Sequence, residues 1–152
     1  MILTRSTDEA IYDTNADGSM RQKKVSDLKN RVKIGNESSA DIFVSIHLNK
    51  IPQEQYYGWQ TFYKNNDEQS KRLAENIQNN LNVSIQKENH RLAKTIENIY
   101  IVDNVDIPIT IIECGFLSNQ EELNNLQNGE YQERLAWGIY NGIMDWFNVV
   151  EK

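Results

Sequence analysis

Two polar side chains that could perform proton or metal chemistry follow runs of apolar, β-forming residues. His47 follows the run at residues 41–46, and Glu113 follows the run at residues 107–112. A neutral imidazole is a good zinc ligand, and a carboxylate that does not bind the metal can take a proton from the attacking water in amide hydrolysis. We therefore consider His47 as a metal ligand and Glu113 as a general base, although either residue alone is more often just a polar side chain that ends a strand.

The sequence supplies fewer metal donors than a catalytic zinc ion needs, which is three protein ligands and a water. The other histidine, His90, lies in the polar segment 87–91 and is expected on the surface. Helical zinc motifs, paired cysteines, nucleophile elbows, phosphate loops and dinucleotide glycine motifs are all absent from the sequence. Cys114 adjoins Glu113, whose charge raises the pKa of a thiol, so we expect a structural role for Cys114.

Helices and strands that alternate along the chain must position these residues. Strands are expected at residues 1–5, 41–46, 59–63, 99–102 and 107–112, and helices at 24–38, 70–81, 120–123 and 131–146. This order predicts an α/β fold with a mixed, largely parallel sheet flanked by helices. The runs before His47 and Glu113 have few polar positions, which predicts strands buried on both faces. Because the carboxyl ends of parallel strands lie at one edge, His47 and Glu113 should share one cleft.

Two long polar loops are expected at residues 6–20 and 50–58, and residues 82–94 have no clear pattern. Tyr56, Tyr57 and Trp59 form an aromatic group at the end of the second loop. Such a group could bind sugar faces or a protein partner, although aromatic residues in a strand are more often part of the core. The chain also begins directly with a strand-like sequence, which suggests that a preceding segment is missing.

Composition limits the possible functions. With 152 residues the chain is expected to form one domain, residues 1–152, with a core of its own. The net charge of −6 argues against a nucleic-acid partner. The sequence contains no apolar stretch long enough to span a membrane. The single cysteine excludes an intrachain disulfide framework.

Several motifs, taken in order, resemble those of the zinc-dependent N-acetylmuramoyl-L-alanine amidases of the amidase-3 type. They are Thr4-Arg5 with Asp8, Asp27-Leu28-x-x-Arg31, Ala40 to Asn49, Gly58 to Tyr63, and Pro108 to Asn119. The Glu-Cys-Gly variant of the last motif, together with Ile99 to Ile101, is most similar to the branch that acts on spore cortex. The resemblance thus covers nearly the whole chain and implies a role in cell-wall remodelling, sporulation or germination.

This resemblance implies hydrolysis of the amide between the lactyl group of N-acetylmuramic acid and L-alanine in peptidoglycan, with zinc as the cofactor. His47 matches the last metal-ligating histidine of the family, and Glu113 matches its catalytic glutamate. Arg91 is similar in position to a residue near the substrate. The expected partner is peptidoglycan or a muropeptide, and the expected location is outside the cytoplasmic membrane.

The sequence also departs from the family pattern. Family members begin with a strand that ends in a Gly-His-Gly-Gly type of turn and a helix that carries a ligating glutamate, and neither is present in residues 1–152. We therefore expect an N-terminally truncated amidase domain that binds zinc weakly by itself. Its exposed sheet edge could pair with a second copy or an accessory protein. The alternatives are a metal-free module that binds peptidoglycan or a partner, and an inactive fragment.

Overall fold

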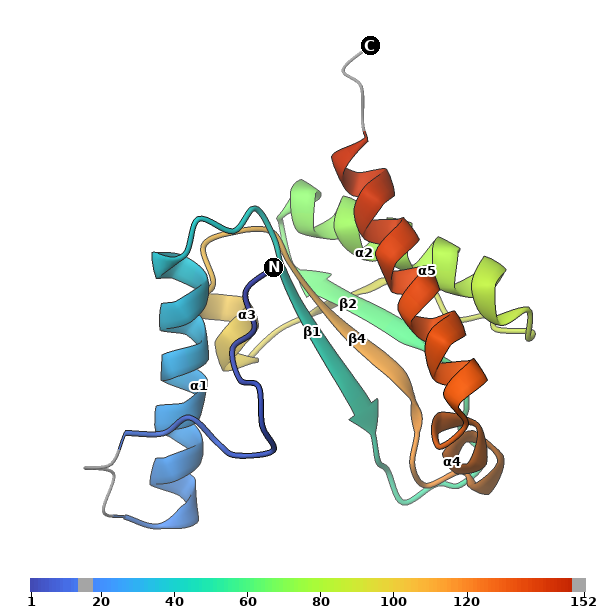
Figure 1. Ribbon diagram of the computed structural model, residues 1–152, viewed down its shortest axis with the longest axis horizontal. Helices are drawn as coiled ribbons and strands as arrows, with labels where there is room; N and C mark the ends of the chain where they lie inside the picture. The colour runs from blue at the N-terminus through green and yellow to red at the C-terminus, as the bar shows by residue number, and fades with distance from the viewer. Residues whose placement is uncertain (14–17, 149–152) are drawn as a thin grey trace.

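The computed structural model describes residues 1–13 and 18–148, and Figure 1 shows their arrangement. The elements in chain order are α1 (Met20–Glu37), β1 (Phe43–Asn49), β2 (Gln60–Lys64), α2 (Glu68–Ile85), β3 (Lys94–Ile96), α3 (Tyr100–Asn104), β4 (Ile109–Phe116), α4 (Gln120–Leu126) and α5 (Gly129–Phe147). None of the described helices is both long enough and apolar enough to cross a membrane.

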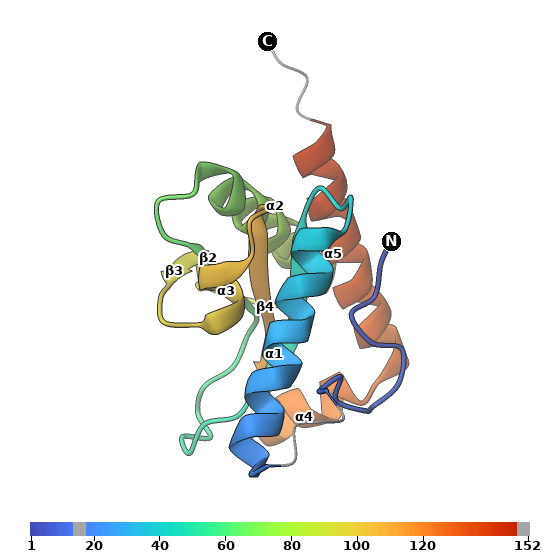
Figure 2. The ribbon, with the colours of Figure 1, turned by 90° about the vertical axis from the view of Figure 1, so that its left-hand side faces the viewer.

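The strands form one mixed sheet in the order β1-β4-β2-β3. β1 is parallel to β4, β2 is antiparallel to β4, and β3 is parallel to β2. Helices α2 and α5 lie on one face of this sheet, while α1 and α3 lie on the other, as the two views in Figures 1 and 2 show. The predicted α/β fold with a mixed sheet and flanking helices is therefore confirmed.

Each face of the sheet has its own apolar core. The larger core joins the sheet to α2, α4 and α5, and its fully buried members include Trp59, Leu73, Ile77 and Ile112. The smaller core lies under α1 and α3 and contains Val32, Ile101, Val102, Val105, Ile109 and Ile111. Since β4 contributes to both cores, it is the buried centre of the sheet, as its continuous apolar sequence predicts.

The expected opening strand at residues 1–5 is wrong. This segment has no strand assignment, and Ile2 and Leu3 are exposed. A strand requires a neighbour that pairs with its backbone, and no described strand pairs with this segment. It contacts α1 instead, where Arg31 Nη1 donates to Thr4 Oγ1 at 3.3 Å. Further along the chain, Ile11 N also contacts α1 by donating to Asp27 Oδ1 at 2.8 Å.

The expected strand at residues 99–102 is also wrong, because the segment forms the short helix α3. Its β-forming residues Ile101 and Val102 are buried in the smaller core, so packing overrides their intrinsic preference. Asn104 Nδ2 donates to Tyr100 O at 2.8 Å and stabilises the helix end. The short strand β3 was missed by the sequence analysis. Its first residue, Lys94, ends the segment 82–94, which shows no clear pattern, and its other two residues follow directly.

The strands that carry His47 and Glu113 differ from expectation in length and burial. β1 continues to Asn49 and β4 to Phe116, so neither His47 nor Glu113 ends its strand. β1 is also not buried on both faces, because it forms an edge of the described sheet and Ile46 is 62% exposed. The helices start and end close to the predicted bounds, with α1 and α2 each extending several residues further.

Candidate active site

His47 and Glu113 lie side by side on one face of the sheet. They are direct partners in the parallel ladder between β1 and β4. Neighbouring strands are about 4.8 Å apart, and directly paired residues project to the same face. The register therefore places the two residues next to each other on one face, and their roles in a shared site stay a prediction.

Glu113 has a partly desolvated carboxylate. Its Oε2 atom is buried and has no hydrogen-bond partner among the residues that the structure describes. Desolvation raises the pKa of Glu113, and the nearby His47 opposes this shift. A carboxylate whose pKa is raised toward neutral pH is suited to accept a proton and to return it.

His47 lies at the exposed edge of the sheet, beside a groove. Its Nε2 atom is 3.0 Å from Ser45 Oγ, two residues earlier on the same face. The groove has a volume of about 540 Å³, and β1 forms one wall while residues 2–5 and α1 form the others. His47 therefore combines an accessible imidazole with open space on the side of β1 that faces away from β4.

Gln60 lies beside Glu113 on the next strand, so that His47, Glu113 and Gln60 form a row of polar side chains across the sheet, which we call the row. Gln60 pairs with Glu113 in the antiparallel ladder between β2 and β4, so His47, Glu113 and Gln60 occupy one line. Gln60 is buried, its Nε2 donates to Leu92 O at 2.9 Å, and its Oε1 accepts from Arg91 Nη1 at 3.0 Å. Sequence reasoning quoted Gln60 only as part of a motif, because a single glutamine in a strand carries no signal of its own.

Arg91 is fixed at the end of this row. Its Nε donates to Tyr57 O at 2.8 Å, and its guanidinium lies over the ring of Phe116 at 4.8 Å and over that of Tyr56 at 5.9 Å. These contacts join the segment after α2 to the loop before β2 and to the end of β4. That Arg91 lies near the substrate stays a prediction.

The aromatic group divides into a buried and an exposed part. Trp59 is fully buried, and its Nε1 donates to Asn82 Oδ1 at 2.8 Å, so it cannot contact a ligand. Tyr56 and Tyr57 are each 43% exposed and border a cavity of about 250 Å³ together with Arg91. Only the two tyrosines therefore remain candidates for binding sugar or peptide.

The two other residues considered for chemistry lie outside this row. His90 is exposed, and its Nε2 is 2.9 Å from Glu88 Oε1 on the surface. Cys114 is buried, and desolvation, with a smaller contribution from Glu113, raises the pKa of its thiol to about 12. A thiol with so high a pKa is not a nucleophile at neutral pH, which agrees with the structural role expected for Cys114.

The described residues do not by themselves make a catalytic zinc site. Across residues 1–13 and 18–148, no three His, Cys, Asp or Glu side chains are grouped so that they could hold a metal ion. The row offers one imidazole and one carboxylate, whereas catalytic zinc takes three protein ligands. The chemistry that this row can perform is therefore proton transfer by Glu113 beside the imidazole of His47.

Comparison with known proteins assigns this architecture to one family. The family model described as N-acetylmuramoyl-L-alanine amidase matches residues 1–145. The germination-specific N-acetylmuramoyl-L-alanine amidase of Bacillus subtilis is 38% identical over 147 residues, which are 97% of this chain and 61% of that relative. The chain thus spans about three fifths of the length of this relative.

Solved structures of two amidases have the same fold. The CwlD amidase from Clostridioides difficile, in complex with the GerS lipoprotein, is 44% identical with a TM-score of 0.94, and the match covers 98% of this chain and 76% of that one. An N-acetylmuramoyl-L-alanine amidase from Clostridium difficile 630 is 32% identical with a TM-score of 0.75, over 82% of this chain and 67% of that one.

Proposed function

We propose that this chain, which belongs to the N-acetylmuramoyl-L-alanine amidase family, provides the proton-transferring part of an enzyme that cleaves peptidoglycan. The bond cleaved is the amide between the lactyl group of N-acetylmuramic acid and L-alanine. The observation that carries the proposal is the in-register pairing of His47 with Glu113, whose carboxylate is partly desolvated. The germination-specific relative supports spore cortex as the substrate.

Glu113 is the general base and then the general acid of this reaction. It accepts a proton from the attacking water, whose oxygen forms a bond to the amide carbon. It then gives the proton to the nitrogen of L-alanine as the C–N bond breaks. The products are a free lactyl carboxylate and a peptide with a new amino terminus. Burial of Oε2 supports this cycle, because desolvation raises the pKa of Glu113 and so makes its carboxylate a better proton acceptor.

Zinc is the cofactor that family membership implies, and we propose His47 as one of its ligands. Catalytic zinc takes three protein ligands, so the further donors would have to be residues other than those that the structure describes. The groove beside β1 supports this proposal, since it runs along the free edge of the strand that carries His47 and has room for another segment. A strand placed there parallel to β1 would end beside His47, because parallel strands have their carboxyl ends at one edge.

We propose association with another chain as an alternative, because the edge of β1 beside the groove is unpaired among the described strands. An unpaired strand edge is a template for a strand from a second copy or from an accessory protein. The CwlD relative was solved with a lipoprotein partner. We place the proposed function outside the cytoplasmic membrane, because peptidoglycan and its cortex form lie there.

The test uses the protein in the form that the cell makes. In the cellular form, Glu113→Gln should lower the release of peptide from muropeptides by at least about a hundredfold and leave the zinc content unchanged. His47→Ala should lower both. Glu133→Gln, on the exposed face of α5, is the matched control and should change neither.

Three results would contradict these assignments. Loss of zinc from a folded Glu113→Gln variant would make Glu113 a ligand instead of the base. Tight one-to-one zinc binding by the 152-residue chain in calorimetry would mean that residues 1–152 contain the other donors. Retention on purified peptidoglycan without any hydrolysis by the cellular form would favour the metal-free binding module.

A further inference from the structure

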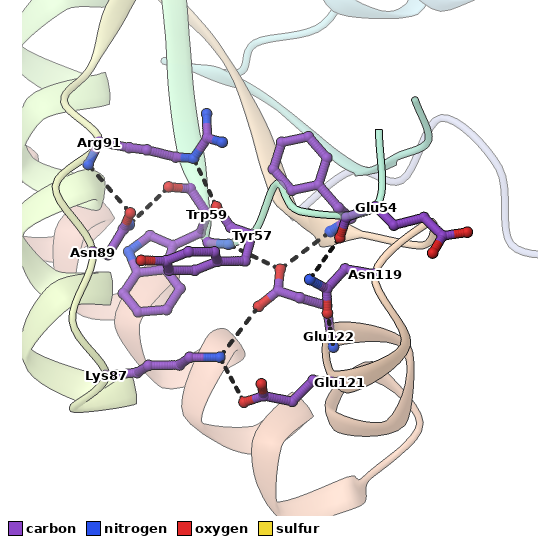
Figure 3. A network of polar contacts seen from close by, with 11 residues as sticks. Glu54, Tyr57, Trp59, Lys87, Asn89, Arg91, Asn119, Glu121 and Glu122 are labelled. Carbon is purple, nitrogen blue, oxygen red and sulfur yellow. Dashed lines mark hydrogen bonds and ion pairs between the residues drawn. The ribbon is translucent and has the colours of Figure 1, made fainter. Parts of the chain in front are cut away.

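Glu122 is a buried carboxylate that the proposed chemistry does not use. It lies in the first turn of α4 and is only 1% exposed. Its Oε2 atom accepts two backbone hydrogen bonds, from Gly58 N at 3.0 Å and from Phe116 N at 3.2 Å. Figure 3 shows Glu122 with the dashed contacts that meet at its carboxylate. A buried carboxylate is costly unless it is hydrogen-bonded, so these two contacts stabilise Oε2, whereas Oε1 has no hydrogen-bond partner among the described residues.

The two amides that bind Oε2 belong to segments that flank the proposed site. Gly58 ends the loop before β2, two residues before Gln60, and Phe116 is the last residue of β4, three residues after Glu113. One carboxylate oxygen thereby ties the loop with Tyr56 and Tyr57 to the end of the strand that carries the base. We call this arrangement the Glu122 clamp, defined by Glu122, Gly58 and Phe116.

Two glycines allow the carboxylate to come this close. Gly58 has a positive φ of 87°, a conformation that glycine adopts at little cost. A Cβ atom at Gly115 would lie 2.8 Å from Glu122 Oε2, so the backbone beside Phe116 can approach the carboxylate only without a side chain. The Gly-Trp-Gln and Glu-Cys-Gly motifs each contribute one of these glycines.

Neighbouring residues hold Glu122 in place. Asn119 caps α4 by accepting from Glu122 N at 3.1 Å, and its Nδ2 donates to Glu54 O at 3.0 Å. Lys87 Nζ lies 3.9 Å from Glu122 Oε1 and 2.9 Å from Glu121 Oε1. In Figure 3, Asn119 on α4 contacts Glu54 in the loop before β2, and Lys87 from the segment after α2 contacts Glu121 and Glu122.

The Glu122 clamp also affects the position of Arg91, because both Glu122 and Arg91 contact the loop before β2. Tyr57 O, which accepts from Arg91 Nε, is one residue before the amide of Gly58. Arg91 in turn donates to Gln60, the direct sheet partner of Glu113. If the loop moved away from β4, Arg91 would lose its acceptor, and the row from His47 to Arg91 would lose one end.

We propose that Glu122 is a positioning residue for the amidase reaction: by accepting from both Gly58 N and Phe116 N, it fixes the Arg91 end of the row against the strand that carries Glu113. This inference rests on the proposed function. It requires an acceptor oxygen at this position, and it does not require Glu122 to touch the substrate. Displacement of a reacting group by about 1 Å can lower a rate by about a hundredfold, so loss of the clamp should affect kcat.

Three substitutions separate the acceptor from the charge. Glu122→Gln keeps an acceptor oxygen and should retain kcat within about threefold. Glu122→Leu has a similar volume but no acceptor, and it should lower kcat at least about tenfold, with a shifted pH profile of kcat/KM. Glu122→Asp keeps the charge but is one methylene shorter, so it should fall between them and replaces Glu122→Leu if that variant does not fold. Glu133→Gln, on the exposed face of α5 and outside these contacts, is the matched control and should leave kcat unchanged.

Amide hydrogen exchange provides a readout that needs no activity. The amides of Gly58 and Phe116 should be protected in the parent protein and in Glu122→Gln, and both should exchange faster together in Glu122→Leu or Glu122→Asp. Faster exchange with an unchanged kcat and pH profile would overturn the positioning role and leave the proposed function intact. Unchanged exchange at both amides would overturn the clamp itself. A parent protein that shows this exchange pattern but hydrolyses no muropeptide would refute the proposed function separately.

Discussion

Helices α2 and α5 pack so closely at Gly142 that one added methyl group should separate them. A Cβ atom at Gly142 would lie 2.4 Å from Ile77 Cα, 2.7 Å from Ile77 N and 2.8 Å from Ile77 Cγ1. Carbon atoms in contact are normally about 3.5 to 4.0 Å apart, so the helices would have to move by about 1 Å. The first two contacts are with backbone, which cannot turn aside as a side chain can.

The expected cost of Gly142→Ala follows from two opposing effects. Overpacking a core typically destabilises by about 1 to 3 kcal/mol, and contacts with backbone favour the upper end of that range. Alanine is better than glycine in a helix by about 1 kcal/mol, which offsets part of the cost. The net loss in the free energy of unfolding should be about 2 kcal/mol, which lowers Tm by about 4 to 8 °C for a chain of this size.

Urea unfolding followed by circular dichroism measures this loss, with Gly129→Ala as the control. No described atom lies within 4 Å of a Cβ built at Gly129, in the first turn of the same helix. Gly129→Ala should therefore leave the midpoint unchanged or raise it slightly. Gly142→Ala should lower the midpoint at a constant m-value. An equal or higher midpoint for Gly142→Ala would refute the close-packing argument.

Two other predictions concern buried ionisable groups. Hydrogen bonds from Arg31 hold the pKa of Asp27 below its ordinary value, so its stabilising contribution is present above about pH 4 and is lost as the pH falls through the lowered pKa. Asp27→Asn should therefore lower the free energy of unfolding by about 2 kcal/mol at pH 7, and the difference should be smaller below pH 4. Glu37→Gln, which removes an exposed ion pair of the same helix, is the control and should be nearly neutral. A difference between Asp27→Asn and the parent that persists at low pH would contradict this prediction. Because Cys114 is buried and its pKa is raised to about 12, a thiol reagent at pH 8 should modify it only as the protein unfolds, and rapid labelling of folded protein would show that the site opens.

The fold class and the central pair of residues could be predicted from the sequence because both depend on patterns along single strands. Continuous β-branched residues identified β4, and the position after each apolar run identified His47 and Glu113. By contrast, α3 was mistaken for a strand, because the burial of Ile101 and Val102 against α1 is a tertiary effect that local preference does not contain.

Gln60 and Glu122 could not be identified from the sequence, for a different reason. Gln60 joins the row only through its antiparallel pairing with Glu113, and Glu122 reaches Gly58 across 64 positions of the sequence. A sequence pattern gives the face on which a residue lies, but not which strand becomes its neighbour. Residues 14–17 of the expected first loop lie outside the described residues, so that part of the loop stays a prediction.

The parallel register of β1 and β4 determines which mutations this site can tolerate. Side chains alternate between the two faces of a strand, so the deletion of one residue within β4 before Glu113 would shift every later residue to the opposite face. Ile112 now faces the larger core on the other side of the sheet, and Glu113 would take that place beneath α2 and α5. The same argument applies to β1, where a change in length between Phe43 and His47 would move His47 to the opposite face from Glu113. Changes in length leave the pairing of His47 with Glu113 intact only where they fall outside the paired segments of these two strands.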